Sequence, residues 1–585
     1  MSPFHRKKIH MLGQRRSTLE QAHGRLVLLS MFFVVAYIIV VARAADLSII
    51  QGALNYGEDV HYYDGGVLDK APIIRADIVD RNGVILARSL KSSSLFVDPV
   101  LVQNPAKVAK DLHKIFPNLS YGSLLQKLQS KKRFVWIKRN ITPEEQSQIL
   151  YLGQPGLNFK EEMRRIYPQG ALTAHMVGAS GVDGQGLAGV EASFDKFLKT
   201  QEQPLQLTLD VRLQHVLKRE ISSTIKSFGA KAGAGIIMDI ETGEVLAATS
   251  LPDFDPHNYQ QAKSSEIFNR LTLGVYELGS SFKIFSTAAL LEKTNANMSQ
   301  KFDVREPLAV GRFKIRDYHP EKRMLSLPEV FIHSSNIGSA MMGQDVGTEN
   351  LQNFYQDIGL FERPSFEVPE IGRPIIPSPW REVNTLTASY GHGIAVSPLQ
   401  LVKAAASIMN GGVLVTPTLI KQAGLSSSAV KKAKNRPDLR VVSPQTSHRM
   451  RQLMRLVVTE GTGNKADIDG YLIGGKTGTA EKPDKGGYSR KKLISSFLGA
   501  FPMDAPRYAV FVMVDEPQGT KESYGYATGG WVGAPTVGRV ISGMVSVMGL
   551  SPNKTEKRFE NSLLRHVKTK EQIQLEKKEQ NIAAH

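Results

Sequence analysis

Three short polar motifs have residue types that suit acyl transfer through a serine. The first, Ser280-Ser281-Phe282-Lys283, places a hydroxyl and an amine three residues apart, so that on a helix they share one face. A serine attacks a carbonyl only when a base takes its proton, and a lysine is that base only when burial or a nearby cation lowers its pKa. The start of a helix also offers backbone N–H groups to an oxyanion. The same spacing recurs elsewhere in the chain, so this pair gains weight only from the other two motifs.

The second and third motifs supply groups for holding a substrate. In Ser334-Ser335-Asn336 the hydroxyl of Ser334 and the amide of Asn336 can relay a proton and hold a substrate amide. The segment 474–480 offers a further set of groups: the Lys476 ammonium, the Thr477 and Thr479 hydroxyls, and Gly478, which leaves room for a substrate backbone beside a strand. These groups suit a substrate that ends in a free carboxylate. Taken alone, the two motifs read as a polar turn and a glycine-rich strand edge.

Regular elements must position these motifs. Apolar periodicity predicts helices over residues 280–292 and 401–409, and strands around Lys476 and over 508–514. Residues 234–238 and 245–248, joined by a polar turn, predict a hairpin that opens the same sheet. Strands, then helices, then strands favour an α+β domain.

A separate region precedes this domain. Residues 75–87 read as strand, Asn-Gly turn and strand. Thr142-Pro143-Glu144-Glu145 is a helix start with a capping box, and 205–226 reads as a short strand followed by an amphipathic helix.

The N-terminus predicts a membrane anchor. Leu26 to Ala42 carries no charged residue, and basic residues precede it. The run is close to the length of about 20 apolar residues that a spanning helix needs, and its basic flank predicts a cytoplasmic N-terminus. The alternative is a cleaved signal peptide, because Ala42-Arg43-Ala44 has the form of a cleavage site. We favour a retained anchor, since the apolar run is longer than usual for a signal peptide.

Composition excludes several classes of protein. The chain has 585 residues, 42% of them hydrophobic, and no cysteine, so disulfide scaffolds, cysteine-ligated metals and catalytic thiols are excluded. A net charge of +18 indicates a polyanionic partner. The basic stretch 131–139 alternates charged and apolar residues, which predicts a solvated strand face and not a nucleic-acid site.

In their order along the chain, the three motifs resemble those of penicillin-binding proteins and active-serine β-lactamases. With the predicted anchor and the large region ahead of Ser280, the chain resembles the class B penicillin-binding proteins, and the cell-division (FtsI) type more than the elongation type. The supporting stretches are 75–87, 164–168, 189–191, 207–210, 242–248 and Tyr390-Gly391-His392-Gly393. The chain departs from the family at Leu278, where a proline usually stands.

The resemblance implies an α+β fold with a single N-terminal transmembrane helix, an elongated pedestal and a transpeptidase domain whose mainly antiparallel sheet is flanked by helices. The implied organisation is a cytoplasmic tail at 1–25, an anchor at 26–43, a pedestal of the dimerisation type at 44–205, a transpeptidase domain at 206–550 and a charged tail at 551–585. The tail is poor in apolar residues and is expected to be frayed or disordered.

The resemblance also implies the roles of the site residues in a peptidoglycan D,D-transpeptidase. Ser280 would attack the penultimate D-Ala of a stem peptide, with Lys283 as base and Ser334 and Asn336 relaying the proton and orienting the amide. The substrate carboxylate would bind Lys476, Thr477 and Thr479 beside Gly478, and the oxyanion hole would be the backbone N–H groups of Ser280 and Thr479. No metal and no organic cofactor is implied.

The implied partners are stem peptides on lipid II-derived strands, β-lactam antibiotics, an FtsW-type glycosyltransferase, other divisome proteins and the inner membrane, with the catalytic domain in the periplasm at the septum. Nucleic acid is not among them. Two alternatives remain: an elongation-type or low-affinity resistance transpeptidase, and a non-catalytic divisome scaffold or β-lactam sensor.

Overall fold

The computed structural model describes residues 31–41, 74–311, 313–421, 440–484, 487–552, 562–568 and 572. The chain divides into two units, Met1–Ala71 and Pro72–His585. In the first unit, residues 31–41 form a helix whose side chains are mostly exposed.

The predicted membrane span lies only partly within the described residues. Residues 26–30 and 42–43 of the span, like the predicted cytoplasmic tail, fall outside them. Over the described part of the chain, no helix is both long enough and apolar enough to cross a membrane.

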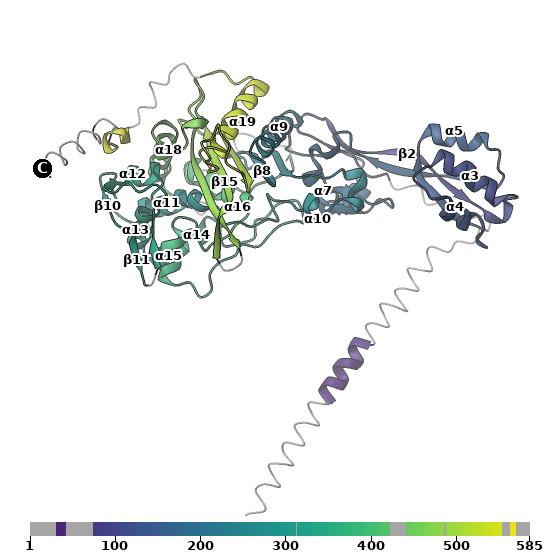
Figure 1. Ribbon diagram of the computed structural model, residues 1–585, viewed down its shortest axis with the longest axis horizontal. Helices are drawn as coiled ribbons and strands as arrows, with labels where there is room; N and C mark the ends of the chain where they lie inside the picture. Colours follow the sequence, from purple (N-terminus) through teal and green to yellow (C-terminus); the bar gives the residue numbers. More distant parts are fainter. Residues whose placement is uncertain are drawn as a thin grey trace, which may run out of the picture. The chain divides into compact units, whose positions relative to one another are not determined.

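A five-stranded antiparallel sheet forms the centre of the C-terminal domain (Figure 1). Its order is β14-β15-β16-β8-β9, so β14 lies at one edge. The strands are β8 (Ala232–Asp239), β9 (Val245–Leu251), β14 (Gly474–Asp484), β15 (Gly487–Phe501) and β16 (Tyr508–Asp515). The predicted hairpin at 234–248 and the predicted strands at Lys476 and 508–514 are therefore present.

Both faces of this sheet are buried under helices. Val510 and Val512 belong to one hydrophobic cluster with the helices α9 (Val211–Ser227) and α19 (Gly533–Met548). Phe511, one residue out of phase, packs into the second cluster on the opposite face. The helices on that face include α11 (Lys283–Lys293), α12 (Leu327–Ile332), α13 (Asn336–Val346), α14 (Thr348–Asp357), α15 (Glu382–Ala388), α16 (Pro398–Met409) and α18 (Pro444–Thr459).

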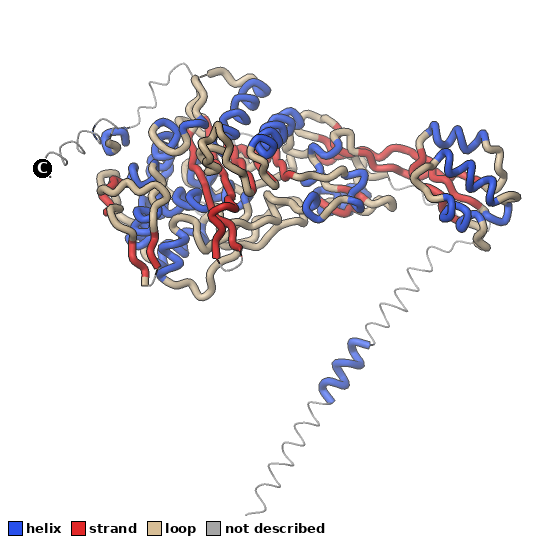
Figure 2. Tube along the Cα trace, in the orientation of Figure 1, coloured by secondary structure: helices blue, strands red, loops and turns tan. Residues whose placement is uncertain are grey.

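The C-terminal domain also carries two small antiparallel sheets of two strands each (Figure 2). Their strands pair as β10 with β13 and β11 with β12. The bounds are β10 (Lys301–Asp303), β11 (Leu308–Val310), β12 (Phe313–Ile315) and β13 (Met324–Ser326).

The preceding region is built on a second sheet of order β3-β2-β1-β7, with β4 paired to β2. Its strands are β1 (Ile78–Val79), β2 (Ile85–Val97), β3 (Val135–Ile141), β4 (Leu157–Ile166) and β7 (Leu205–Gln206), and its helices include α3 (Pro105–Ile115), α4 (Tyr121–Leu128), α5 (Pro143–Tyr151), α6 (Ala174–Val177), α7 (Gly189–Ser193) and α8 (Asp195–Thr200). The capping box predicted at Thr142 is present, because Thr142 Oγ1 accepts a bond from Glu145 N, and Thr142 N donates to Glu145 Oε2.

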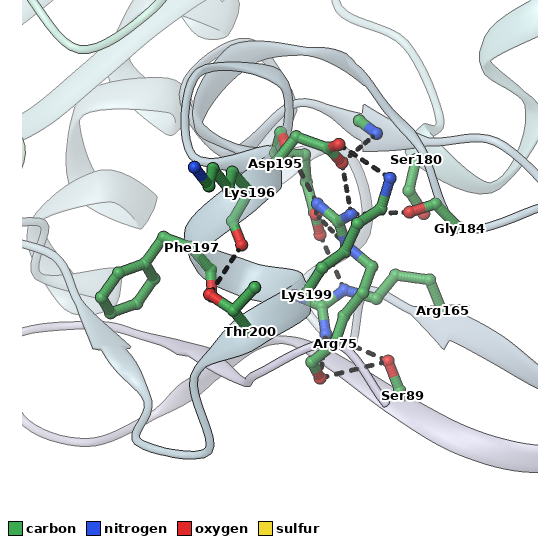
Figure 3. Close-up of polar contacts among 12 residues, drawn as sticks. Arg75, Ser89, Arg165, Ser180, Gly184, Asp195, Lys196, Phe197, Lys199 and Thr200 are labelled. Atoms are coloured by element: carbon green, nitrogen blue, oxygen red, sulfur yellow. Dashed lines mark hydrogen bonds and ion pairs between the residues drawn. The ribbon is translucent and has the colours of Figure 1, made fainter. Parts of the chain in front are cut away.

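A buried ionic cluster joins distant parts of this region (Figure 3). The Glu191 carboxylate accepts a hydrogen bond from Arg75 Nη2 at 2.6 Å and another from Arg165 Nε at 2.7 Å. Arg75 also donates to Asp195 at 2.5 Å. Arg75, Glu191 and Arg165 are buried, and with Asp195 the two positive and two negative charges of the cluster balance, which is the condition for tolerating them there. The stretches 75–87, 164–168 and 189–191, which support the family resemblance, thus contact one another in this cluster.

The basic stretch at 131–139 lies partly in β3, as predicted. Three of its cations are paired: Lys138 Nζ lies 2.6 Å from Glu145 Oε1, Arg139 Nη2 lies 2.6 Å from Glu162 Oε1, and Arg133 Nε lies 2.8 Å from Asp98 Oδ2. This pairing leaves little of its charge for a nucleic acid.

The prediction of a frayed or disordered tail is wrong for residues 562–568. A short 3-10 helix, η9 (Ser562–His566), buries Leu563 in the main hydrophobic cluster. The His566 carbonyl accepts a hydrogen bond from Ser326 Oγ, and Lys568 N donates to Glu329. The prediction rested on the low apolar content of the tail, whereas burial of the single residue Leu563 holds this otherwise charged segment against the domain.

Candidate active site

The first motif lies at the start of a buried helix. Its residues form a 3-10 turn, η5 (Gly279–Phe282), which leads directly into α11 at Lys283. The predicted helix is therefore present, although its first turn is tighter than an α-helix. Gly279 has φ +52°, a conformation that favours glycine, and it allows the chain to enter the turn against β14.

The second motif is a strained turn between two capped helices. Ser326 and Glu329 form a capping box at the start of α12, and Ser335 caps α13. Between the helices, Ser334 adopts φ +60°, in the left-handed region that is uncommon for a serine. Asn336 is the first residue of α13. The turn carries the side chains of Ser334 and Asn336 to Lys283.

Lys283 is the centre of the polar network. It is fully buried, and its Nζ lies 3.1 Å from Ser280 Oγ, 3.1 Å from Ser334 Oγ and 2.8 Å from Asn336 Oδ1. It also donates to the Ser334 carbonyl at 2.5 Å. Each of these distances is within reach for direct proton transfer or a hydrogen bond.

The third motif brings a second buried amine to the same hydroxyl. Lys476 lies on β14 and is fully buried. Its Nζ is 2.9 Å from Ser334 Oγ, so this one hydroxyl lies between the amines of Lys283 and Lys476. The structure thus brings together five residues that sequence reasoning selected: Ser280, Lys283, Ser334, Asn336 and Lys476.

Burial lowers the pKa of both amines, and the charge of Lys476 adds to this shift at Lys283. Burial, together with the charge of Lys476, lowers the pKa of Lys283 well below its ordinary value, while the Asp317 carboxylate opposes this shift. Burial lowers the pKa of Lys476 to about 7. A lysine adjacent to the serine is therefore able to accept its proton at neutral pH.

The hydroxyls of the third motif lie on the other face of β14. Thr477 Oγ1 is 2.8 Å from Thr462 Oγ1 and 3.5 Å from Lys476 Nζ. Thr479 Oγ1 accepts a hydrogen bond from Gly529 N at 3.0 Å. Thr462 was missed by sequence reasoning, since it belongs to no motif and reaches the site only through the fold.

The prediction that Gly478 leaves room for a substrate backbone beside the strand is wrong. A side chain at this position would point into the protein, within 2.5 Å of Ser281 Oγ and 2.8 Å of the Leu278 carbonyl. Gly478 therefore allows β14 to approach the η5 turn, and it does not clear space for a substrate.

The same close approach orients the edge of β14. The Thr479 carbonyl lies against Gly279, where a Cβ would collide with it. In an antiparallel strand the N–H and C=O of one residue point to the same edge, so the Thr479 N–H also faces the turn that carries Ser280. This is the position expected for one donor of an oxyanion hole.

The sequence did not indicate a group of polar contacts around the Glu277 carboxylate, next to the nucleophile. Glu277, three residues before Ser280, accepts hydrogen bonds from Tyr488 Oη at 2.9 Å and from Gly393 N at 3.1 Å. His392 Nδ1 lies 3.2 Å from its other oxygen. Burial and this carboxylate raise the pKa of Tyr488, which therefore remains a donor. Glu277 thus ties β15 and the 390–393 loop to the segment that carries the nucleophile.

Comparison with known families assigns both globular regions. Residues 233–540 match the penicillin binding protein transpeptidase domain, and residues 70–230 match the penicillin-binding protein dimerisation domain. The chain therefore belongs to the class B penicillin-binding proteins, as the order of its motifs predicted.

Its relatives place it with the FtsI type. A probable peptidoglycan D,D-transpeptidase FtsI from Caulobacter vibrioides is 37% identical over 506 residues, which cover 84% of each chain. The peptidoglycan D,D-transpeptidase FtsI of Escherichia coli is 29% identical, covering 82% of this chain and 84% of the relative. Stage V sporulation protein D of Bacillus subtilis is 32% identical, covering 83% and 80%.

Solved structures share the fold. Penicillin binding protein 3 from Mycobacterium tuberculosis, complexed with ampicillin, superimposes with a TM-score of 0.65 at 24% identity, covering 83% of this chain and 97% of that one. The two-domain architecture predicted from the sequence is thereby confirmed.

Proposed function

We propose that this chain is a peptidoglycan D,D-transpeptidase that cross-links stem peptides through an acyl-enzyme on Ser280 during septal wall synthesis. The observation that carries the proposal is the continuous chain of contacts that runs from the Ser280 hydroxyl to the buried Lys283 amine, then to Ser334 Oγ and the buried Lys476 amine. β-Lactams acylate the same serine because they imitate the D-Ala-D-Ala end of a stem peptide.

Acylation begins at the Ser280–Lys283 pair. Neutral Lys283 takes the proton of Ser280 across 3.1 Å as the oxygen attacks the carbonyl of the penultimate D-Ala. The backbone N–H groups of Ser280 and Thr479 stabilise the oxyanion. The proton then passes to the leaving amine of the terminal D-Ala through Ser334, which contacts Lys283 and Lys476.

Substrate recognition falls to the third motif. The Lys476 ammonium and the hydroxyls of Thr477 and Thr479 receive the terminal carboxylate, while Asn336 orients the substrate amide. An amine of a neighbouring stem peptide then attacks the acyl-enzyme, and its proton returns along the same path to Ser280, which restores the free enzyme.

The proposed organisation follows the sequence. Residues 1–25 are cytoplasmic, 26–43 anchor the chain in the inner membrane as a single span, and 44–205 and 206–550 form the pedestal and transpeptidase domains in the periplasm. We propose an FtsW-type glycosyltransferase among the divisome proteins as its partner. A fluorescent fusion at midcell, and not along the side wall, is the outcome that supports the septal role.

The decisive experiment labels the full chain in membranes with fluorescent penicillin. Ser280→Ala removes the attacking oxygen, so labelling should disappear. The matched control is Ser281→Ala, the same change one residue on, at a buried hydroxyl without a hydrogen-bond partner among the described residues. The control should label like the wild type. An unlabelled wild type, or a labelled Ser280→Ala variant, would refute the proposal.

A further inference from the structure

A surface loop that belongs to none of the three motifs contacts the turn that carries Ser334 and Asn336. Asp317 lies between β12 and β13 and is half-buried, whereas its neighbours Arg316 and Tyr318 are exposed. Its carboxylate faces the start of α13.

Three donors from successive residues converge on that carboxylate. Asn336 N donates to Oδ1 at 2.5 Å, and Ile337 N donates to the same oxygen at 3.0 Å. Ser335 Oγ donates to Oδ2 at 2.7 Å. The two N–H donors belong to the start of α13, where a negative charge is favourable. Asp317 therefore caps α13 from a different part of the chain.

The loop fixes the Asn336 side chain as well as its backbone. Asn336 Nδ2 donates to the Arg316 carbonyl at 3.0 Å, which leaves Oδ1 to accept from Lys283 at 2.8 Å. Ser334, two residues earlier, is held at φ +60°, an unfavourable backbone conformation that persists only when its surroundings impose it. The contacts of Asp317 to the next three residues provide such a constraint.

We propose that Asp317 is a positioning residue for acylation: its carboxylate holds the Ser334–Asn336 turn in the conformation that presents a hydroxyl and an amide to Lys283. The inference rests on the proposed function and assigns this loop a part in the same reaction. Asp317 does not touch the reacting atoms and acts through the turn.

The charge of Asp317 gives the proposal a second, separable readout. Two charged groups act on the pKa of Lys283: the Lys476 ammonium lowers it and the Asp317 carboxylate raises it. Because Lys283 must be neutral to act as base, the acid limb of the acylation rate follows its pKa. Removing the carboxylate charge lowers that pKa, so the acid limb moves to lower pH.

The test measures the acylation rate of the full chain by penicillin between about pH 5 and 9, together with its melting temperature. Asp317→Asn should slow acylation by about ten- to a hundredfold, as expected for a misplaced catalytic group, and should shift the acid limb to lower pH. Asp317→Glu keeps the charge but displaces the carboxylate, so it should slow acylation without moving the limb. Asp210→Asn is the matched control: Asp210 caps α9 and contacts Arg212 and Asn82, outside the catalytic network.

A helix cap of purely structural value would lower the melting temperature in both Asn variants and leave the acid limb in place. That result, or wild-type rates in both Asp317 variants, would overturn the role of Asp317. If Asp317→Asn fails to fold, Asp317→Glu decides by its rate alone. Absence of acylation in the wild type would instead overturn the proposed function.

Discussion

At the scale of single residues, one hydroxyl lies between two buried amines. Ser334 Oγ is 3.1 Å from Lys283 Nζ and 2.9 Å from Lys476 Nζ. Two full positive charges this close in a buried site repel strongly, and their titrations depend on one another. The pair therefore favours a state in which Lys283 is neutral and Lys476 carries the charge that binds a carboxylate.

Lys476→Met is expected to remove catalysis and spare folding. It keeps the length of the side chain and deletes the ammonium, so acylation by penicillin should fall about a hundredfold or more, as for other electrostatic groups. The pKa of Lys476 in the folded chain is about 7, below its ordinary 10.5. Between these values the unfolded chain binds more protons, so this group makes the free energy of unfolding rise with pH.

The cost of burying the charge is therefore fully present below pH 7 and disappears towards pH 10.5. The melting temperature of Lys476→Met relative to the wild type should be highest below pH 7 and should decline as pH rises. A variant that unfolds before it loses acylation would contradict the role given to Lys476.

At the scale of elements, the site depends on how closely one edge strand approaches one helical turn. β14 is the edge of its sheet, and Gly279 and Gly478 allow it to lie against η5. The two elements carry Lys476 and Ser280 respectively. Their separation therefore sets the geometry between the carboxylate site and the nucleophile.

Gly478→Ala should damage stability and acylation together. The new methyl group would lie 2.5 Å from Ser281 Oγ and 2.8 Å from the Leu278 carbonyl, so β14 must shift away from η5. We expect a loss of about 1–3 kcal/mol, typical of overpacking, and slower penicillin labelling. Gly122→Ala in α4 is the control, because nothing lies within 4 Å of its methyl group. It should be neutral or stabilising, and an equal loss in both variants would refute the packing argument.

The motifs and their elements were predictable because each leaves a local pattern. The spacing of Ser280 and Lys283 indicates a shared helix face, and the continuous apolar run around Val510 is consistent with a strand buried on both sides. Thr462, Glu277 and Asp317 leave no such pattern. Each joins the site through a contact between segments distant in sequence, so only the folded chain reveals them. The prediction for Gly478 failed for the same reason. A sequence does not say which face of an edge strand packs against the rest of the protein.

At the scale of the whole molecule, the C-terminal segment closes back onto the catalytic domain. Leu563 is 5% exposed, and the segment bonds to Ser326 and Glu329, the two residues that cap α12. Since α12 leads into the Ser334 turn, the segment supports the active site from behind. The low apolar content of the segment predicted that it would be frayed or disordered. Composition is an average over many residues, and here the single buried residue Leu563 makes the contact.

Leu563→Ala should destabilise the chain by about 2 kcal/mol, the lower end for a buried leucine, and lower its melting temperature. The matched control is Leu564→Ala, the same change at a neighbour that is 47% exposed. It should have little effect. Equal melting temperatures for the two variants would show that the segment does not dock in solution.

Strand β2 has a mechanical consequence. It is 13 residues long, about 40 Å at the usual rise of a strand, and it pairs with β1 near its start and with β3 and β4 further along. Strand β1 in turn pairs with β7, close to α9 of the catalytic domain. A pull along β2 would load its hydrogen bonds to β4 in shear, all at once, and not one after another. The β2–β4 ladder should therefore resist extension, so that a force applied to the pedestal reaches the catalytic domain through β2, β1 and β7.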